Sequence, residues 1–196
     1  MPKVTDEHIA ARRRQILDAA LVRFSSQGFH RTPMQAIFDE AGLSPGAVYR
    51  YFKSKEEIVQ AIASETLGGF IEAIEVGPGD EPLGPAELLE RLLDAVESVG
   101  LLTDRLRMAV QVWGEALHNP EIRDFLVETV ATLRARMSAD LRDAQRRGAL
   151  DPSIDPDAAA RVLLALAQGY VVQTTWSEQF DRVAFRATAH ALLDPA

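Results

Sequence analysis

Three helix-start signals lie close together between residues 32 and 57, and they divide this part of the chain into short helices. Thr32 and Ser44 each precede a proline, and Ser54 stands three residues before Glu57. A hydroxyl side chain can accept a hydrogen bond from a free N–H of the first helical turn, and proline is well tolerated at the first helical position. Gly42 can end the first of these helices, because glycine readily takes the left-handed conformation. The pattern therefore predicts helices that begin just after Thr32, Ser44 and Ser54.

The segment after Ser44 has two faces of different chemistry when it is placed on a helix. Val48 and Phe52 lie four residues apart, so they share one face and can be buried together. The opposite face carries small, aromatic and basic side chains, which are Pro45, Gly46, Tyr49, Arg50 and Lys53. Two short helices joined by a tight turn form a helix-turn-helix, whose second helix lies in the major groove of DNA. The pattern favours a DNA-reading helix from Pro45 to about Phe52.

Basic residues are concentrated at the start of an otherwise acidic chain. The 196 residues have a net charge of −8. Residues 1–55 contain nine basic and five acidic residues, a net charge of +4, which leaves −12 for the remainder. This asymmetry suggests that only the first part of the chain meets a polyanion, although chance segregation of charge would give the same numbers.

Helical periodicity extends through the rest of the chain, and no strand pattern interrupts it. An amphipathic helix is predicted at Arg12–Ser26 and a long helix from Lys55 to Ile74, and the Gly- and Pro-rich segment Gly77–Pro85 is predicted to be a loop. The further predicted helices are Ala86–Val99, Asp104–His118, Pro120–Arg147, Asp157–Trp176 and Arg182–Leu193. We therefore expect an all-α protein.

Several classes of function lack their signatures in this sequence. The chain has no cysteine, its four histidines form no metal-type pair, and no nucleophile elbow, P-loop or dinucleotide fingerprint occurs. We therefore expect no enzyme, no cofactor and no metal site. No secretion signal and no unbroken apolar span of about 20 residues is present, so a soluble, cytoplasmic protein that does not enter a membrane is expected.

The predicted helix Asp157–Trp176 is apolar around most of its circumference. A helix of this kind must be covered on all sides. In a chain of this length, its outer face is expected to contact a second subunit, which predicts a homodimer. The alternative is a central core helix in a monomer.

The segment ILDAALVRFSSQGFHRTPMQAIFDEAGLSPGAVYRYFKSKEEIV, residues 16–59, resembles the N-terminal domain of the TetR family of bacterial transcriptional regulators. The resemblance departs at Phe38, where the family usually has alanine, and this ring must change the packing of the two short helices. The resemblance implies an N-terminal helix-turn-helix DNA-binding domain, residues 1–54, and a larger helical effector-binding and dimerisation domain, residues 55–196. It also implies that the last two helices pair with those of a second copy. The DNA-binding residues expected from facing pattern and resemblance are Thr32, Ser44, Pro45, Gly46, Tyr49, Arg50, Tyr51 and Lys55.

The resemblance and the helix faces lead to one main functional expectation. This is a regulator, most simply a repressor, that a small hydrophobic or aromatic ligand releases from a palindromic double-stranded DNA operator. The later helices are mostly apolar, and their large side chains and polar groups are candidates to line an elongated cavity. These candidates are Met108, Gln111, Trp113, Phe125, Met137, Tyr170, Gln173 and Trp176. Each of them is also explained as an ordinary core residue. The alternative is a helical ligand-binding or protein-interaction module that does not read DNA.

Overall fold

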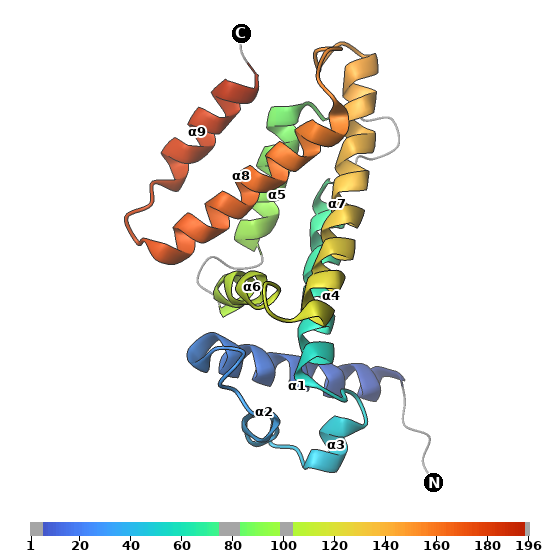
Figure 1. Cartoon of the computed structure of the whole chain (residues 1–196), viewed down its shortest axis with the longest axis vertical. Helices are drawn as coiled ribbons and strands as arrows, with labels where there is room; N and C mark the ends of the chain where they lie inside the picture. The colour runs from blue at the N-terminus through green and yellow to red at the C-terminus, as the bar shows by residue number, and fades with distance from the viewer. Residues whose placement is uncertain (1–5, 75–82, 99–103, 195–196) are drawn as a thin grey trace. The chain divides into compact units, whose positions relative to one another are not determined.

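The computed structural model describes residues 6–74, 83–98 and 104–194, and the regular structure in these ranges is entirely α-helical (Figure 1). The all-α expectation is confirmed for this part of the chain. Residues 77–82 of the expected loop Gly77–Pro85 lie outside the described residues. Val99, the expected end of the helix that begins at Ala86, also lies outside them. The helices are α1 (Asp6–Gln27), α2 (Met34–Ala41), α3 (Pro45–Tyr49), α4 (Lys55–Ile74), α5 (Pro85–Ser98), α6 (Asp104–Glu115), α7 (Pro120–Arg146), α8 (Pro156–Trp176) and α9 (Arg182–Leu193).

Packing divides the chain into two compact units. Unit 1 contains Met1–Glu65 and Leu102–Leu126, and unit 2 contains Thr66–Leu101 and Val127–Ala196. The sequence-based division after residue 54 assigned α6 to the second domain, whereas packing groups α6 with the helix-turn-helix. The functional boundary after residue 54 stays a prediction.

The core of unit 1 brings one apolar stripe of α1 against α2, α3, α4 and α6. Helix α6 lies against α1, and α1 also packs on α2. Val48 and Phe52 are buried in this core together, as their four-residue spacing predicted. The core includes Ile16, Leu17, Ala20, Phe24, Phe29, Ile37, Phe38, Val48, Phe52, Ile58, Val59, Ile62, Met108, Val112 and Ile122.

The core of unit 2 is centred on α5. Helix α5 packs against both α8 and α9 (Figure 1). Leu88, Leu89, Leu92 and Leu93 make α5 the most buried helix of this unit, because they occupy adjoining positions on one helical face. Helix α9 buries only Ala189 among its described residues. Its Phe185 ring lies 5.4 Å from the Tyr170 ring of α8, and its Arg186 pairs with Glu90 of α5.

Two of the three predicted helix caps are confirmed. The Ser44 hydroxyl accepts a hydrogen bond of 3.3 Å from the Ala47 N–H at the start of α3. The Ser54 hydroxyl accepts one of 3.2 Å from the Glu57 N–H, while the Glu57 carboxylate accepts one of 2.6 Å from the Lys53 N–H. Helix α3 ends at Tyr49 rather than near Phe52.

The third predicted cap, Thr32, is wrong. Helix α2 begins at Met34 with Pro33 at the N-cap position, where no side chain caps the helix. Thr32 is fully buried, and its hydroxyl donates a hydrogen bond of 2.8 Å to the Gly28 carbonyl oxygen. Gly28 has a φ of +84° at the end of α1, and its carbonyl satisfies a hydroxyl that would otherwise be buried without a partner.

Candidate DNA-binding surface

The turn between α2 and α3 is closed by backbone hydrogen bonds that require a glycine. Gly42 has a φ of +64°, which a side chain would make costly. The Gly42 N–H donates to the Asp39 carbonyl oxygen, and the Leu43 N–H donates to the Phe38 carbonyl oxygen at 3.0 Å. Helix α3 can therefore begin at Pro45, directly after the Ser44 cap.

Helix α3 and the residues around it present one buried and one exposed face. Val48 is completely buried, and Phe52 is nearly so. Tyr51 is half-buried and packs against the core of unit 1. The exposed residues of the opposite face are Ser44, Pro45, Gly46, Tyr49, Arg50 and Lys53. The structure thus brings most of the predicted DNA-binding residues together on one surface, and their contacts with DNA stay predictions.

Tyr49 carries the large aromatic ring of this surface, and it contacts both Phe38 and Lys53. Its ring lies 5.3 Å from the Phe38 ring, centroid to centroid, with 70° between the two planes. Its carbonyl oxygen accepts a hydrogen bond of 2.5 Å from the Lys53 ammonium group. Both the ring and the backbone of Tyr49 are therefore held by neighbours within unit 1.

Two predicted phosphate-binding residues are engaged inside the protein. The Lys55 ammonium group donates a hydrogen bond of 3.0 Å to the Phe29 carbonyl oxygen and lies 4.6 Å from the centroid of the Phe29 ring. Thr32 offers no hydroxyl to solvent, because that group is buried on Gly28. Their contacts with DNA phosphates stay predictions.

Sequence reasoning missed residues that hold this surface from a distance. The Gln15 amide of α1 donates a hydrogen bond of 2.7 Å to the Ala41 carbonyl oxygen at the end of α2. The Arg13 guanidinium lies 4.6 Å from the centroid of the Phe52 ring. No local sequence pattern marks either of these contacts. The departure from the family pattern at Phe38 indicated only a change in the packing of α2 and α3.

The candidate effector residues of unit 1 are largely occupied by packing. Met108 is buried in the core. The Gln111 side-chain oxygen accepts a hydrogen bond of 3.2 Å from the Phe29 N–H. Trp113 and Phe125 are half-buried. An inward-facing Glu115 would bias a cavity toward a neutral or cationic compound. Its carboxylate lies 3.3 Å from the exposed His30 ring nitrogen.

The candidates in unit 2 separate into buried and exposed residues. Met137 and Tyr170 are completely buried, and the Tyr170 hydroxyl donates to the Glu97 carboxylate. Gln173 is exposed, and Trp176 is 76% exposed. Two of these four side chains are thus buried and two are exposed, and their role in binding an effector stays a prediction.

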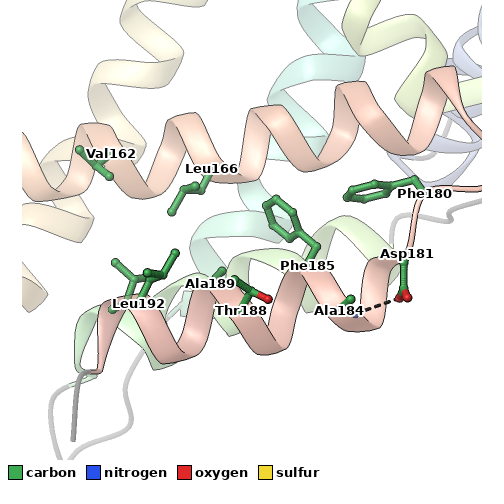
Figure 2. A pocket seen from close by; sticks show the side chains of 10 residues that line it. Val162, Leu166, Phe180, Asp181, Ala184, Phe185, Thr188, Ala189 and Leu192 are labelled. Atoms are coloured by element: carbon green, nitrogen blue, oxygen red, sulfur yellow. Dashed lines mark hydrogen bonds between the residues drawn. The ribbon is translucent and has the colours of Figure 1, made fainter.

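A groove of about 630 Å³ lies between α8 and α9 (Figure 2). In the close-up, Val162 and Leu166 of α8 face Phe185, Ala189 and Leu192 of α9. The complete lining is Val162, Leu166, Phe180, Asp181, Ala184, Phe185, Thr188, Ala189, Leu192 and Leu193. This groove is almost wholly apolar and open to solvent, and no lining residue suggests catalytic chemistry.

Across residues 6–74, 83–98 and 104–194, no cluster of three or more histidine or acidic side chains has a metal-binding arrangement. None of the helices in these ranges has the length and apolar composition needed to cross a bilayer.

Two family models match different parts of the sequence. Residues 16–62 match the model for bacterial regulatory proteins of the tetR family. Residues 85–195, more than half of the chain, match the model for the C-terminal domain of BetI-type transcriptional repressors. These ranges cover the helix-turn-helix and α5 through α9.

Curated relatives and solved structures agree with both models. The chain is 26% identical over 182 residues to the HTH-type transcriptional regulator UidR of Escherichia coli strain K12, covering 92% of this chain and 90% of UidR. It superposes on Salmonella enterica GusR with a TM-score of 0.81 and 29% identity, over 97% and 96% of the two chains. Bacillus subtilis FadR, solved in complex with stearoyl-CoA, shares the fold with a TM-score of 0.77 and 23% identity, over 93% and 97%.

The exposed recognition face, the matched models and these relatives all indicate a helix-turn-helix regulator rather than a module that does not read DNA. This chain belongs to the TetR family of bacterial transcriptional regulators, and it is a DNA-binding transcriptional regulator.

Proposed function

We propose that this regulator is a cytoplasmic homodimer without catalytic activity that represses transcription from a palindromic operator and is released by a small, mostly apolar ligand. The observation that carries the proposal is the exposed face of α3, where Tyr49 and Arg50 stand opposite the buried Val48.

The exposed face of α3 has the chemistry of a major-groove reader. Pro45 and Gly46 are small, so the first turn of α3 can approach base edges closely. Arg50 can donate two hydrogen bonds to one guanine, and the Tyr49 ring can contact a thymine methyl group. Tyr51 and Lys55 would contact phosphates, which position the protein without reading sequence.

An anisotropy titration against the regulator's own upstream DNA tests this assignment. Binding that resists competitor DNA and falls steeply with salt supports it. Tyr49→Ala or Arg50→Ala should weaken specific binding by about 1–3 kcal/mol. Unchanged affinity in both folded variants would remove the recognition role from α3.

The outer side of α8 and α9 supports the proposed dimer. Val162 is 54% exposed and Leu192 is 76% exposed, although both are apolar and border the same groove. A continuous apolar surface of this kind marks an interface more often than a solvated face. A second copy that covers the groove by twofold symmetry would present two equal recognition helices, which requires a palindromic site.

An apolar effector is supported by the ligand seen in one neighbour with the same fold. FadR of Bacillus subtilis was solved with stearoyl-CoA, so a chain with this fold can hold a ligand that carries a long acyl chain. A ligand releases DNA only through a difference in its affinity for the two states of the protein. Tryptophan fluorescence against a panel of apolar and aromatic compounds, with Trp113→Phe and Trp176→Phe to locate the response, tests this step. A compound that releases DNA with both tryptophan signals unchanged would place the effector elsewhere.

A further inference from the structure

We propose that Phe38 is a positioning residue for DNA reading, because its ring fixes the orientation of the Tyr49 ring on the recognition surface. This inference rests on the proposed contact between Tyr49 and the operator. It assigns part of the sequence preference to a residue that does not itself face solvent.

Phe38 is a rigid support. Its side chain is only 4% exposed and belongs to the core of unit 1. Its carbonyl oxygen accepts the Leu43 N–H at 3.0 Å, so its backbone closes the turn between α2 and α3. A close-packed core side chain has little freedom to change rotamer, because its neighbours occupy the surrounding volume.

Tyr49, in contrast, has few supports of its own. It is 41% exposed and stands at the end of a helix of only five residues. The edge-on contact with Phe38 is an aromatic pair of favourable geometry, with the ring centroids 5.3 Å apart. The contact selects one orientation for a ring that would otherwise sample several.

Orientation matters because DNA binding must otherwise order this side chain. A contact residue held in its bound orientation loses less conformational entropy on association. The hydrogen bond from Lys53 to the Tyr49 carbonyl oxygen, 2.5 Å long, restrains the backbone at the same residue. The size and shape of residue 38 would therefore set how the Tyr49 ring projects from α3, and thus which base step it meets.

A double-mutant cycle tests whether Phe38 acts through Tyr49. An operator is first selected from a random duplex library with the wild-type protein. Dissociation constants are then measured on this duplex and on an unrelated duplex for the wild type, Phe38→Leu, Tyr49→Ala and the double variant. We expect Phe38→Leu to lower the ratio of specific to non-specific affinity by roughly 2- to 12-fold, the range of an aromatic pair. Non-specific affinity should not change, since it depends on phosphate contacts.

In the Tyr49→Ala background, Phe38→Leu should have almost no further effect on that ratio. Phe24→Leu is the matched control, because Phe24 is a fully buried ring of the same core that packs on Phe29 instead. It should lower stability but leave the ratio unchanged. Should Phe38→Leu fail to fold, the same cycle is run with Phe38→Met, whose unbranched, flexible side chain can adapt to the space that the ring leaves.

The possible results separate this inference from the proposed function. Equal losses from Phe38→Leu in both backgrounds, or an equal loss from Phe24→Leu, would reduce Phe38 to a core residue and overturn the inference while leaving the Tyr49 contact intact. A Tyr49→Ala variant with unchanged specificity would instead contradict the Tyr49 contact, and the inference with it.

Discussion

The ammonium group of Lys55 lies 4.6 Å from the centroid of the Phe29 ring and donates a hydrogen bond to the Phe29 carbonyl oxygen. The Phe29 N–H donates a hydrogen bond to the side-chain oxygen of Gln111. Both backbone polar groups of Phe29 are thus bound by side chains, one from α4 and one from α6. The connection between α1 and α2 is tied to two other helices of unit 1 through this single residue.

Lys55→Ala should therefore change two measured quantities. Loss of a hydrogen bond from a charged group should lower the free energy of unfolding by about 1–3 kcal/mol. Loss of a phosphate contact should weaken binding to all duplexes and reduce the slope of log affinity against log salt by about 0.9. Lys55→Arg, which keeps the charge, should retain the slope. A less stable Lys55→Ala protein with the wild-type slope would limit Lys55 to its contact with Phe29.

Leu166→Glu should dissociate the proposed dimer, because it places a charge in the apolar groove between α8 and α9. Light scattering at micromolar concentration measures the change. Leu117→Glu is the matched control, since Leu117 is 80% exposed and belongs to unit 1. Equal behaviour of the two variants, or a monomeric wild type both free and on DNA, would refute the predicted interface.

Arg186→Leu should loosen α9 from α5. The Arg186 guanidinium contacts Glu90 at 2.5 Å and Glu97 at 3.4 Å, and it also pairs with Asp94. Its removal leaves these partly exposed carboxylates without their shared cation, at a cost of about 1–2 kcal/mol, since solvent screens the charges. Chemical unfolding and light scattering should show a less stable, more readily dissociated protein. Arg182→Leu, an exposed change on the same helix, should have a much smaller effect; equal effects would assign the loss to general helix propensity.

Asp140→Asn should stabilise the protein at neutral pH. Burial raises the pKa of the Asp140 carboxyl, although the Arg136 and Arg91 guanidinium groups oppose the shift. A carboxyl with a raised folded pKa stabilises the fold below its unfolded pKa, near 3.8, and loses that contribution as pH rises through the folded pKa. The stability gained by the variant should therefore grow between that pH and neutrality. Denaturant titrations at several pH values measure it, with Glu128→Gln on the exposed side of α7 as control. A pH-independent difference would contradict the assignment.

Local signals in the sequence predicted the local parts of the site. The Ser44 cap and the Gly42 turn follow from neighbouring residues alone, and together they place the start of α3 correctly. The Thr32 prediction failed because Pro33 occupies the N-cap position, and the buried Thr32 hydroxyl donates to the Gly28 carbonyl, which only the turn after α1 brings near. Contacts between residues far apart in the sequence could not be read at all. Gln111 lies 82 residues from Phe29, and this separation explains why the sequence did not reveal the hydrogen bond between them. The role of Gln111 in binding an effector stays a prediction.

The packing unit that contains the helix-turn-helix is not one continuous stretch of sequence. Helix α6 lies against α1, and Met108 and Val112 complete the core that also buries Phe38 and Val48. A chimaeric regulator made by exchanging only residues 1–54 would leave α1 facing a foreign α6. An exchange that transfers the wild-type operator preference must carry Leu102–Leu126 as well, which makes recombination between distant regulators a two-segment event.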